Sequence, residues 1–245
     1  MIDKIRVMFD FITLLPGFIG AIQLIVTLDP EVMDIALRSI QVSTAATLIA
    51  ALIAIPLGAL IYFYDFPGKR GVINLVQTLY ALPTVIVGLV VYLLISHSGP
   101  LGFLDLLYTT KAMTIAQVIL VSPLIIGFTI SALTGLDRDM KNTVLGLNAP
   151  AYRAMLTLVR EAKFAILSAV VLAFGRAIAE VGAVMMVGGN IRHFTRTLTT
   201  AISLNTSMGE FSVSIALGII LLGIALIVNL GVNVLQYRGM RVKDD

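Results

Sequence analysis

The most regular feature of this sequence is a series of six long apolar stretches separated by short polar segments. Four of them contain no charged residue, a fifth is shorter and also uncharged, and a sixth contains one arginine and one glutamate. A helix needs about 20 apolar residues to cross the hydrocarbon core of a bilayer. The pattern predicts an all-α integral membrane protein with about six transmembrane helices, at residues 11–28, 39–64, 71–96, 112–136, 164–189 and 211–237.

Composition supports this prediction. Hydrophobic residues make up 58% of the chain and charged residues 13%, whereas soluble domains carry roughly 25% charged residues. The surplus apolar surface must face lipid. The runs are too long for the strands of a membrane barrel, which alternate over about ten residues. The chain contains no cysteine, which excludes a disulfide framework and a thiolate metal site.

Lysine and arginine are divided unequally between the two sides of the predicted membrane. Twelve of the 17 fall on one side and four on the other, with Arg176 inside a span. Positive charge marks the cytoplasmic side, so we expect both termini in the cytoplasm. The first stretch could alternatively be a cleaved signal peptide, since Lys4 and Arg6 precede it. Residues 24–30 offer no small-x-small cleavage site, so we interpret the stretch as a retained helix.

The longest cytoplasmic segment, residues 137–163, has the pattern of two short helices. Gly146 can end the first, and Asn148 can cap the second with Pro150 inside its first turn. Asp137 or Asp139 can cap the start of the first helix. In the second helix, apolar residues recur at helical spacing: Tyr152, Met155, Leu156 and Val159. The pair could lie on lipid headgroups or bind a partner.

This segment resembles the cytoplasmic loop of ABC-importer permeases. In that loop Glu-Ala-Ala is followed after three residues by glycine and nine residues later by Ile-x-Leu-Pro. Here Gly146, Leu156 and Leu158 match at the correct spacing, whereas residues 140–142 and Val159 differ from the acidic triplet and the proline. On this resemblance we expect ATPase coupling at Leu145, Gly146, Leu147, Asn148, Ala149, Tyr152 and Arg153.

The neighbouring segments extend the resemblance over nearly the whole chain. Residues 174–184, 188–191 and 195–202 resemble the fifth helix and the outer loop of molybdate, sulfate and tungstate permeases, and residues 99–102 resemble their first outer loop. The likeness is greatest to tungstate-type permeases. It implies an oxyanion importer with a homodimer around a two-fold pathway, a cytoplasmic ABC ATPase and an extracytoplasmic oxyanion-binding protein. No nucleic acid partner is expected.

The sequence contains no nucleotide-binding motif. The only Gly-Lys pair, Gly68-Lys69, lacks both the leading glycine and the following hydroxyl of a phosphate-binding loop. We therefore expect a transport subunit that is not itself an enzyme and holds no cofactor or metal, with ATP and Mg²⁺ bound by the partner ATPase.

Charged and polar residues inside the spans are the candidates for the translocation pathway or a gate. Arg176 and Glu180 lie four residues apart and share a helix face. A charge at a helix centre costs about 2.5–3.5 kcal/mol on insertion scales, so both should face protein or water. Arg176 could contact an anion, or the two could form an ion pair that locks packing or a gate. The nearby carboxylate would repel a divalent oxyanion, which favours the ion pair.

Uncharged polar groups in other spans are further candidates, although a hydroxyl can equally bond its own helix backbone. They are Thr44, Thr47, Gln77 and Thr78, with Ser43, Asn74, Ser122 and Thr129. Prolines 56, 83 and 123 are expected to kink their spans.

Two other classes of membrane protein fit the sequence less well. A self-sufficient carrier or channel would have ion ligands in two inverted halves, and only one half here holds a charge pair. An intramembrane protease would need a Ser–His pair or two aspartates within the spans, which the sequence lacks. Molybdate or sulfate stays open beside tungstate, because selectivity would reside largely in the binding protein.

Overall fold

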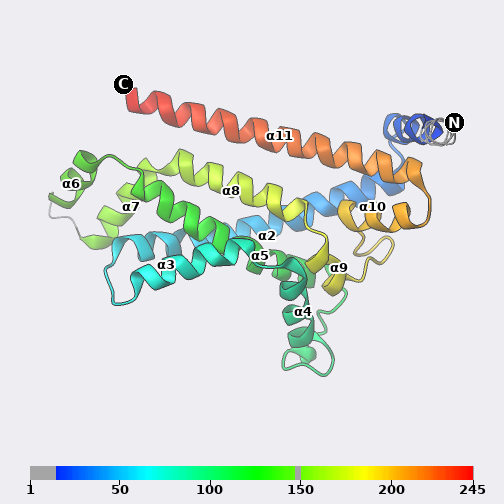
Figure 1. Ribbon diagram of the computed structural model, residues 1–245, viewed down its shortest axis with the longest axis horizontal. Coiled ribbons are helices and arrows are strands. Elements are labelled where there is room, and N and C mark those ends of the chain that lie inside the picture. The colour runs from blue at the N-terminus through cyan, green and yellow to red at the C-terminus, as the bar shows by residue number, and fades with distance from the viewer. Residues whose placement is uncertain (1–14, 147–149, 245) are drawn as a thin grey trace, which may run out of the picture.

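The computed structural model describes residues 15–146 and 150–244, and every regular element in these ranges is a helix. The helices form an elongated bundle (Figure 1). Three of them are long and apolar enough to cross a membrane singly: α2 (Pro30–Phe63), α5 (Thr110–Thr134) and α11 (Phe211–Asp244). The prediction of an all-α membrane protein is confirmed.

Helix α2 begins nine residues before the predicted second span, because Asp29 caps it. The Oδ1 atom of Asp29 accepts hydrogen bonds from the backbone N–H groups of Glu31 (3.0 Å) and Val32 (3.1 Å). Such a cap satisfies donors that a helix start otherwise leaves unpaired. The helix then runs unbroken through Pro56, and α5 runs unbroken through Pro123.

The third and fifth spans are not the single helices that we expected. The third consists of α3 (Lys69–Thr78), the short 3-10 turn η1 (Leu79–Ala81) and α4 (Thr84–Ile95), with a bend of 98°. The fifth consists of α8 (Lys163–Ile178) and α9 (Gly182–Gly188), with a bend of 59°. Pro83 separates η1 from α4, as expected of a residue that lacks a backbone N–H. The second break contains no proline.

Small residues let the central helices approach one another closely. Ala50 and Ala54 of α2 are buried against Val121 of α5 and against Ala173 and Ala177 of α8. Close approach through small side chains is the usual way for membrane helices to pack. The core therefore lies where α2, α5 and α8 meet.

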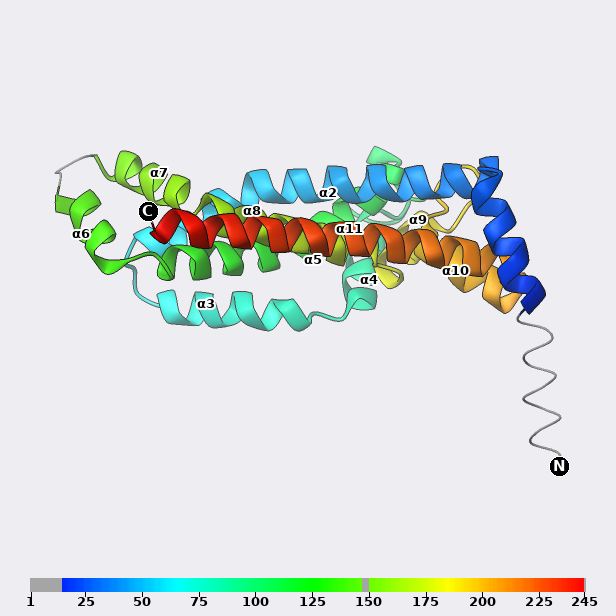
Figure 2. The same ribbon diagram turned by 90° about the horizontal axis from the view of Figure 1, so that it is seen from above.

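The first described helix, Leu15–Val26, has 12 residues and lies across one end of the bundle rather than along it (Figure 2). Its Gly17 and Gly20 pack on Phe211 and Ser212 at the start of α11. At 1.5 Å per residue it is about 18 Å long, so the described part of the first predicted span is too short to cross a membrane by itself.

Helices also occupy the segments between spans. At one end of the bundle lie α6 (Arg138–Gly146) and α7 (Ala151–Glu161), the two short helices predicted for the cytoplasmic segment. At the opposite end lies α10 (Leu198–Ser207), which the sequence pattern did not predict, and a 3-10 turn, η2 (Gly102–Leu104), follows α4. Thr197 is the N-cap residue of α10, and its side chain and that of Thr200 cap each other's backbone in a capping box.

Candidate functional site

The break between α8 and α9 holds the one charge pair of the fifth span. Arg176 Nη1 lies 2.9 Å from Glu180 Oε2. The glutamate side chain is 2% exposed and the arginine side chain 40% exposed. The structure therefore pairs the two residues, with the carboxylate inside the chain and the guanidinium at its surface.

Other polar groups saturate this break. The second carboxylate oxygen of Glu180, Oε1, accepts a hydrogen bond from the backbone N–H of Ala183 in the first turn of α9 (3.1 Å). Gln117 of α5 donates from Nε2 to the carbonyl of Ala177 (2.9 Å), and Thr199 of α10 donates to the carbonyl of Glu180 (2.6 Å). Buried backbone groups without partners are costly, so these side chains allow a span to be broken inside an apolar core. Sequence analysis missed both Gln117 and Thr199.

Most of the uncharged pathway candidates do not meet at one site. Thr47 is buried and bonds the carbonyl of Ser43 (2.7 Å), and Thr78 bonds that of Asn74 (2.9 Å), both within their own helices. These bonds fit the alternative that we left open for hydroxyls. Thr44 is exposed on α2.

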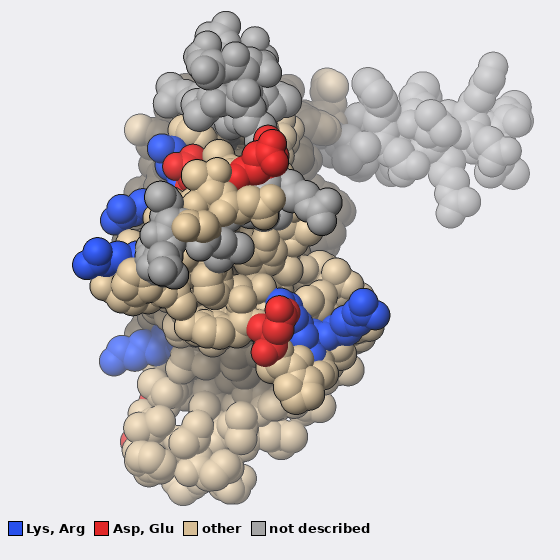
Figure 3. All heavy atoms as spheres, turned by 90° about the vertical axis from the view of Figure 1, so that its left-hand side faces the viewer, with Lys and Arg blue, Asp and Glu red and all other residues tan. Residues whose placement is uncertain are grey.

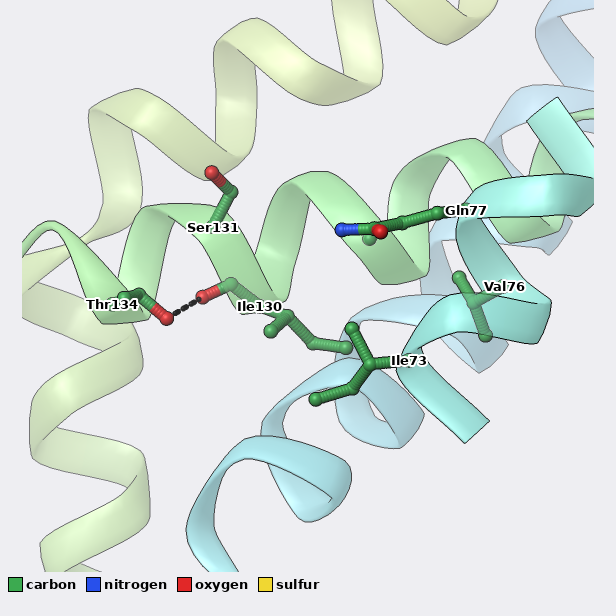
Figure 4. Close-up of a pocket in the computed structure, with 7 residues that line it drawn as sticks. Ile73, Val76, Gln77, Ile130, Ser131 and Thr134 are labelled. Carbon is green, nitrogen blue, oxygen red and sulfur yellow. Dashed lines mark hydrogen bonds between the residues drawn. The ribbon is translucent and has the colours of Figure 1, made fainter. Parts of the chain in front are cut away.

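Gln77 is the exception, because it lines a hollow of about 290 Å³ between α3 and α5. Figure 4 shows its amide directed toward α5, whose Ser131 and Thr134 also line the hollow. Thr134 also donates to the carbonyl of Ile130 (2.8 Å). Ser131 and Thr134 were absent from the sequence prediction. Only the packing of α3 on α5 brings them next to Gln77.

At the end formed by α6 and α7, the expected coupling residues are partly visible. Leu147, Asn148 and Ala149 lie outside the described residues. Asp137 caps the start of α6, since its Oδ1 accepts a hydrogen bond from the N–H of Asp139 (3.1 Å). Helix α7 starts at Ala151 with Pro150 as its N-cap residue, so Pro150 lies just before the first turn and not inside it as predicted.

Helix α7 has one buried and one exposed apolar side. Ala154 and Leu158 are buried, Leu158 within a cluster that includes Leu133 of α5. Tyr152 is 60% exposed and Leu156 is 48% exposed. Arg153 Nε donates to the Tyr152 hydroxyl (3.0 Å). The buried side anchors the helix to the spans and leaves Tyr152, Arg153 and Leu156 accessible.

The space around Gly146 is open among the described residues. This glycine is the last residue of α6, and a β-carbon there would lie more than 4 Å from every described atom that it could meet. Within the described part of the chain, Gly146 has free space around it.

Basic side chains gather at the same end, as Figure 3 shows for the face formed by α6, α7 and the start of α3. Lys69, Arg70, Arg153, Arg160 and Lys163 all belong to these elements or their junctions. The fold thus places residues that are far apart in sequence on one end of the bundle.

The opposite end carries a network of ion pairs that holds the loop between α9 and α10 to the start of α2. Arg192 bonds both carboxylate oxygens of Glu31 (2.8 and 2.6 Å), and Glu31 raises the pKa of the Arg192 guanidinium above its usual value. Arg38 pairs with Asp34 (2.7 Å) and also donates to the carbonyls of two loop residues, His193 (3.0 Å) and Arg196 (3.3 Å). The loop is therefore fixed by two arginines, one exposed and one nearly buried.

Among the described residues, no three side chains of histidine, aspartate or glutamate come together in a way that could hold a metal ion. The polar groups of the two broken spans and the exposed side of α7 are thus the arrangements in the described chain that could carry function.

Long apolar helices and two bent spans with a buried polar break define a multi-pass membrane protein. The family model of the binding-protein-dependent transport system inner membrane component matches residues 54–240. This chain belongs to that family. The expected ABC-importer membrane subunit of the molybdate, sulfate and tungstate branch is confirmed.

Similar proteins cover most of the chain. The tungstate uptake system permease protein TupB of Peptoclostridium acidaminophilum is 43% identical over 220 residues, which cover 90% of this chain and 96% of that protein. TupB of Campylobacter jejuni is 39% identical over 91% of this chain and 93% of its own. A probable anion ABC transporter permease protein of Haloferax volcanii is 41% identical over 86% of this chain and 90% of its own.

A solved structure shares the fold. A chain from a bacterial alginate ABC transporter, determined in complex with an alginate pentasaccharide-bound periplasmic protein, superposes with a TM-score of 0.66. The match covers 97% of this chain and 93% of that chain at 17% identity.

Proposed function

We propose that this chain forms the membrane pathway of an ATP-driven importer for tungstate. The observation that supports tungstate as the substrate is the 43% identity to a tungstate uptake permease over nearly the full length of both proteins. Molybdate is the second candidate, because a molybdate/tungstate permease of Thermococcus kodakarensis is 31% identical over 65% of this chain.

The proposed topology has six spans with both termini in the cytoplasm. Three long helices give three crossings, and the total rises to five if each bent pair is one span. The N-terminal segment would supply the sixth. The excess of lysine and arginine at the end with α6 and α7 supports a cytoplasmic position for that end.

Two kinds of partner complete the proposed importer. A cytoplasmic ATPase would supply ATP hydrolysis, because the sequence contains no phosphate-binding loop. An extracytoplasmic oxyanion-binding protein would deliver the substrate. The family description and the periplasmic protein bound to the alginate transporter support this partner. A second copy of this chain would enclose the pathway around a two-fold axis, with Thr44, Thr47, Gln77 and Thr78 as proposed lining residues.

Residues 145–153 are the proposed contact with the ATPase. The exposed Tyr152 and Leu156, four residues apart on α7, form an apolar side with Arg153 beside it. Apolar side chains at this spacing commonly anchor a helix in a groove of a partner. The buried Ala154 and Leu158 would transmit movement of α7 to α5.

The Gly146→Val substitution tests this contact. The described part of the chain has space for the new side chain, so insertion and folding should be unaffected. ATPase assembly should be lost, because the valine side chain would lie within the proposed contact. Gly71→Val is the matched control, because Gly71 lies in α3 at the same end and also has no described atom within 4 Å of its β-carbon position. Full ATPase binding by Gly146→Val would refute the proposed contact.

Reconstitution tests the function as a whole. The chain assembled with its ATPase and binding protein in liposomes should take up radiolabelled tungstate when ATP is supplied, and the chain alone should not. Excess molybdate or sulfate in the same assay ranks the three anions. Nucleotide-driven uptake by the chain alone would remove the proposed division of labour.

A further inference from the structure

We infer that Arg176 is a contact for the transported oxyanion, which it binds through guanidinium N–H groups that Glu180 leaves free. This inference rests on the proposed import of an oxyanion and assigns one binding residue within it.

The ion pair between Arg176 and Glu180 is asymmetric in burial. Glu180 is almost fully buried and both of its carboxylate oxygens are occupied, one by Arg176 Nη1 and the other by the backbone N–H of Ala183. Repulsion by this carboxylate was the reason to doubt an anion contact. The structure places the carboxylate behind the guanidinium, so an approaching anion meets the cation first.

Arg176 keeps N–H donors that Glu180 does not use. A guanidinium has five N–H groups in a rigid fork. Only Nη1 of Arg176 makes a hydrogen bond to another described residue. Nε and Nη2 lie on the 40% exposed side chain, free to bind two oxygens of a tetrahedral anion at once, the geometry that arginine favours.

The depth of Arg176 within its span excludes lipid as the environment of its side chain. Arg176 follows Lys163, the charged first residue of α8, by 13 residues, which corresponds to about 20 Å along the helix. A cation at that depth is costly in hydrocarbon. The exposed guanidinium therefore faces water or protein in the assembled transporter.

The pairing also suits transport rather than storage. A conducting site must bind strongly enough to admit its ion and weakly enough to release it. Glu180 neutralises the formal charge of Arg176, so a dianion would gain hydrogen bonds without being held by an uncompensated cation.

Substitutions that separate the pair from the anion contact test this inference. In the importer reconstituted with its ATPase and binding protein, the double variant Arg176→Gln/Glu180→Gln removes both charges and should keep assembly and ATP hydrolysis. Tungstate uptake should fall about 10- to 100-fold, the loss expected for one or two charge-assisted hydrogen bonds.

A purely structural ion pair predicts the opposite result: the neutral double variant, whose two amides can still bond each other, would stay within twofold of the wild type. That result overturns the inference. The control double variant Asp65→Asn/Lys69→Gln removes a pair of the same spacing at the start of α3 (2.9 Å) and should leave uptake unchanged.

Two further measurements keep the test decisive. If the neutral double variant fails to assemble, Arg176→Lys retains a partner for Glu180 but loses the fork, and it should raise the KM for tungstate about 10-fold. An unchanged KM overturns the inference. A wild-type importer that takes up no oxyanion refutes the proposed function, and this inference with it. Wild-type uptake with no effect of these variants refutes the inference alone.

Discussion

Gly182, the first residue of α9, lies directly against Thr84, the first residue of α4. A β-carbon at Gly182 would be 3.0 Å from both Thr84 Oγ1 and Val85 Cγ2. The two broken spans therefore pack on each other at their breaks. Further along the same contact, a β-carbon at Gly88 would be 2.8 Å from Ala183 Cα. The bends of 98° and 59° are fitted to one another through glycine.

Substituting Gly88 by alanine should destabilise the protein. The new methyl group would meet a backbone atom, which cannot move aside cheaply, and overpacking of this kind costs about 1–3 kcal/mol. Thermal unfolding in detergent should show a lowered Tm. Gly223→Ala in α11 is the control, because no described atom lies within 4 Å of its β-carbon position, and alanine favours a helix over glycine. Equal Tm values for the two variants would contradict the close contact.

Replacing Thr199 by valine should also lower the Tm. The substitution keeps the shape of the side chain but leaves the carbonyl of Glu180 without its 2.6 Å hydrogen bond from α10. A buried group without a partner costs about 1–3 kcal/mol. Thr114→Val provides the comparison, since Thr114 bonds a carbonyl of its own helix and should have a smaller effect. An unaltered Tm in Thr199→Val would show that the break does not need this bond.

The loop between α9 and α10 should depend more on Arg38 than on Glu31. Arg38 is nearly buried and holds two loop carbonyls, whereas the pair of Glu31 with Arg192 is largely exposed. Exposed ion pairs contribute at most about 1 kcal/mol. Arg38→Met should therefore increase amide hydrogen exchange over residues 190–197, and Glu31→Gln should change it little. The reverse order of effects would assign the loop to the exposed pair.

Single cysteines can test the proposed topology, because the natural chain contains none. An impermeant thiol reagent added to intact cells should label cysteine at position 97 or 192, both exposed, and should not label position 70. Position 198 is the internal control, since Leu198 is completely buried in the same outer segment as Arg192. Labelling at position 70 from outside would reverse the orientation.

Several elements of the fold could be predicted from the sequence. The long uncharged stretches predicted α2, α5 and α11, and the turn residues predicted the pair α6 and α7. Arg176 and Glu180 were recognised as a pair from their spacing alone. By contrast, a kink was predicted for the third span at Pro83 but not its 98° bend, the break in the fifth span was not predicted, and α10 was missed.

What the sequence determined is the set of properties that depend on neighbouring residues: hydropathy, the sidedness of positive charge, and the four-residue spacing of the charge pair. Each of these can be summed along a short stretch of chain. What only the tertiary structure decided depends on residues far apart in sequence. Gln117 reaches the broken span from 60 residues away, Ser131 and Gln77 line one hollow from two different helices, and Glu180 is turned inward while Arg176 is left accessible. A helix can bend where it does because side chains from other helices satisfy its exposed backbone groups, and no local pattern contains that information.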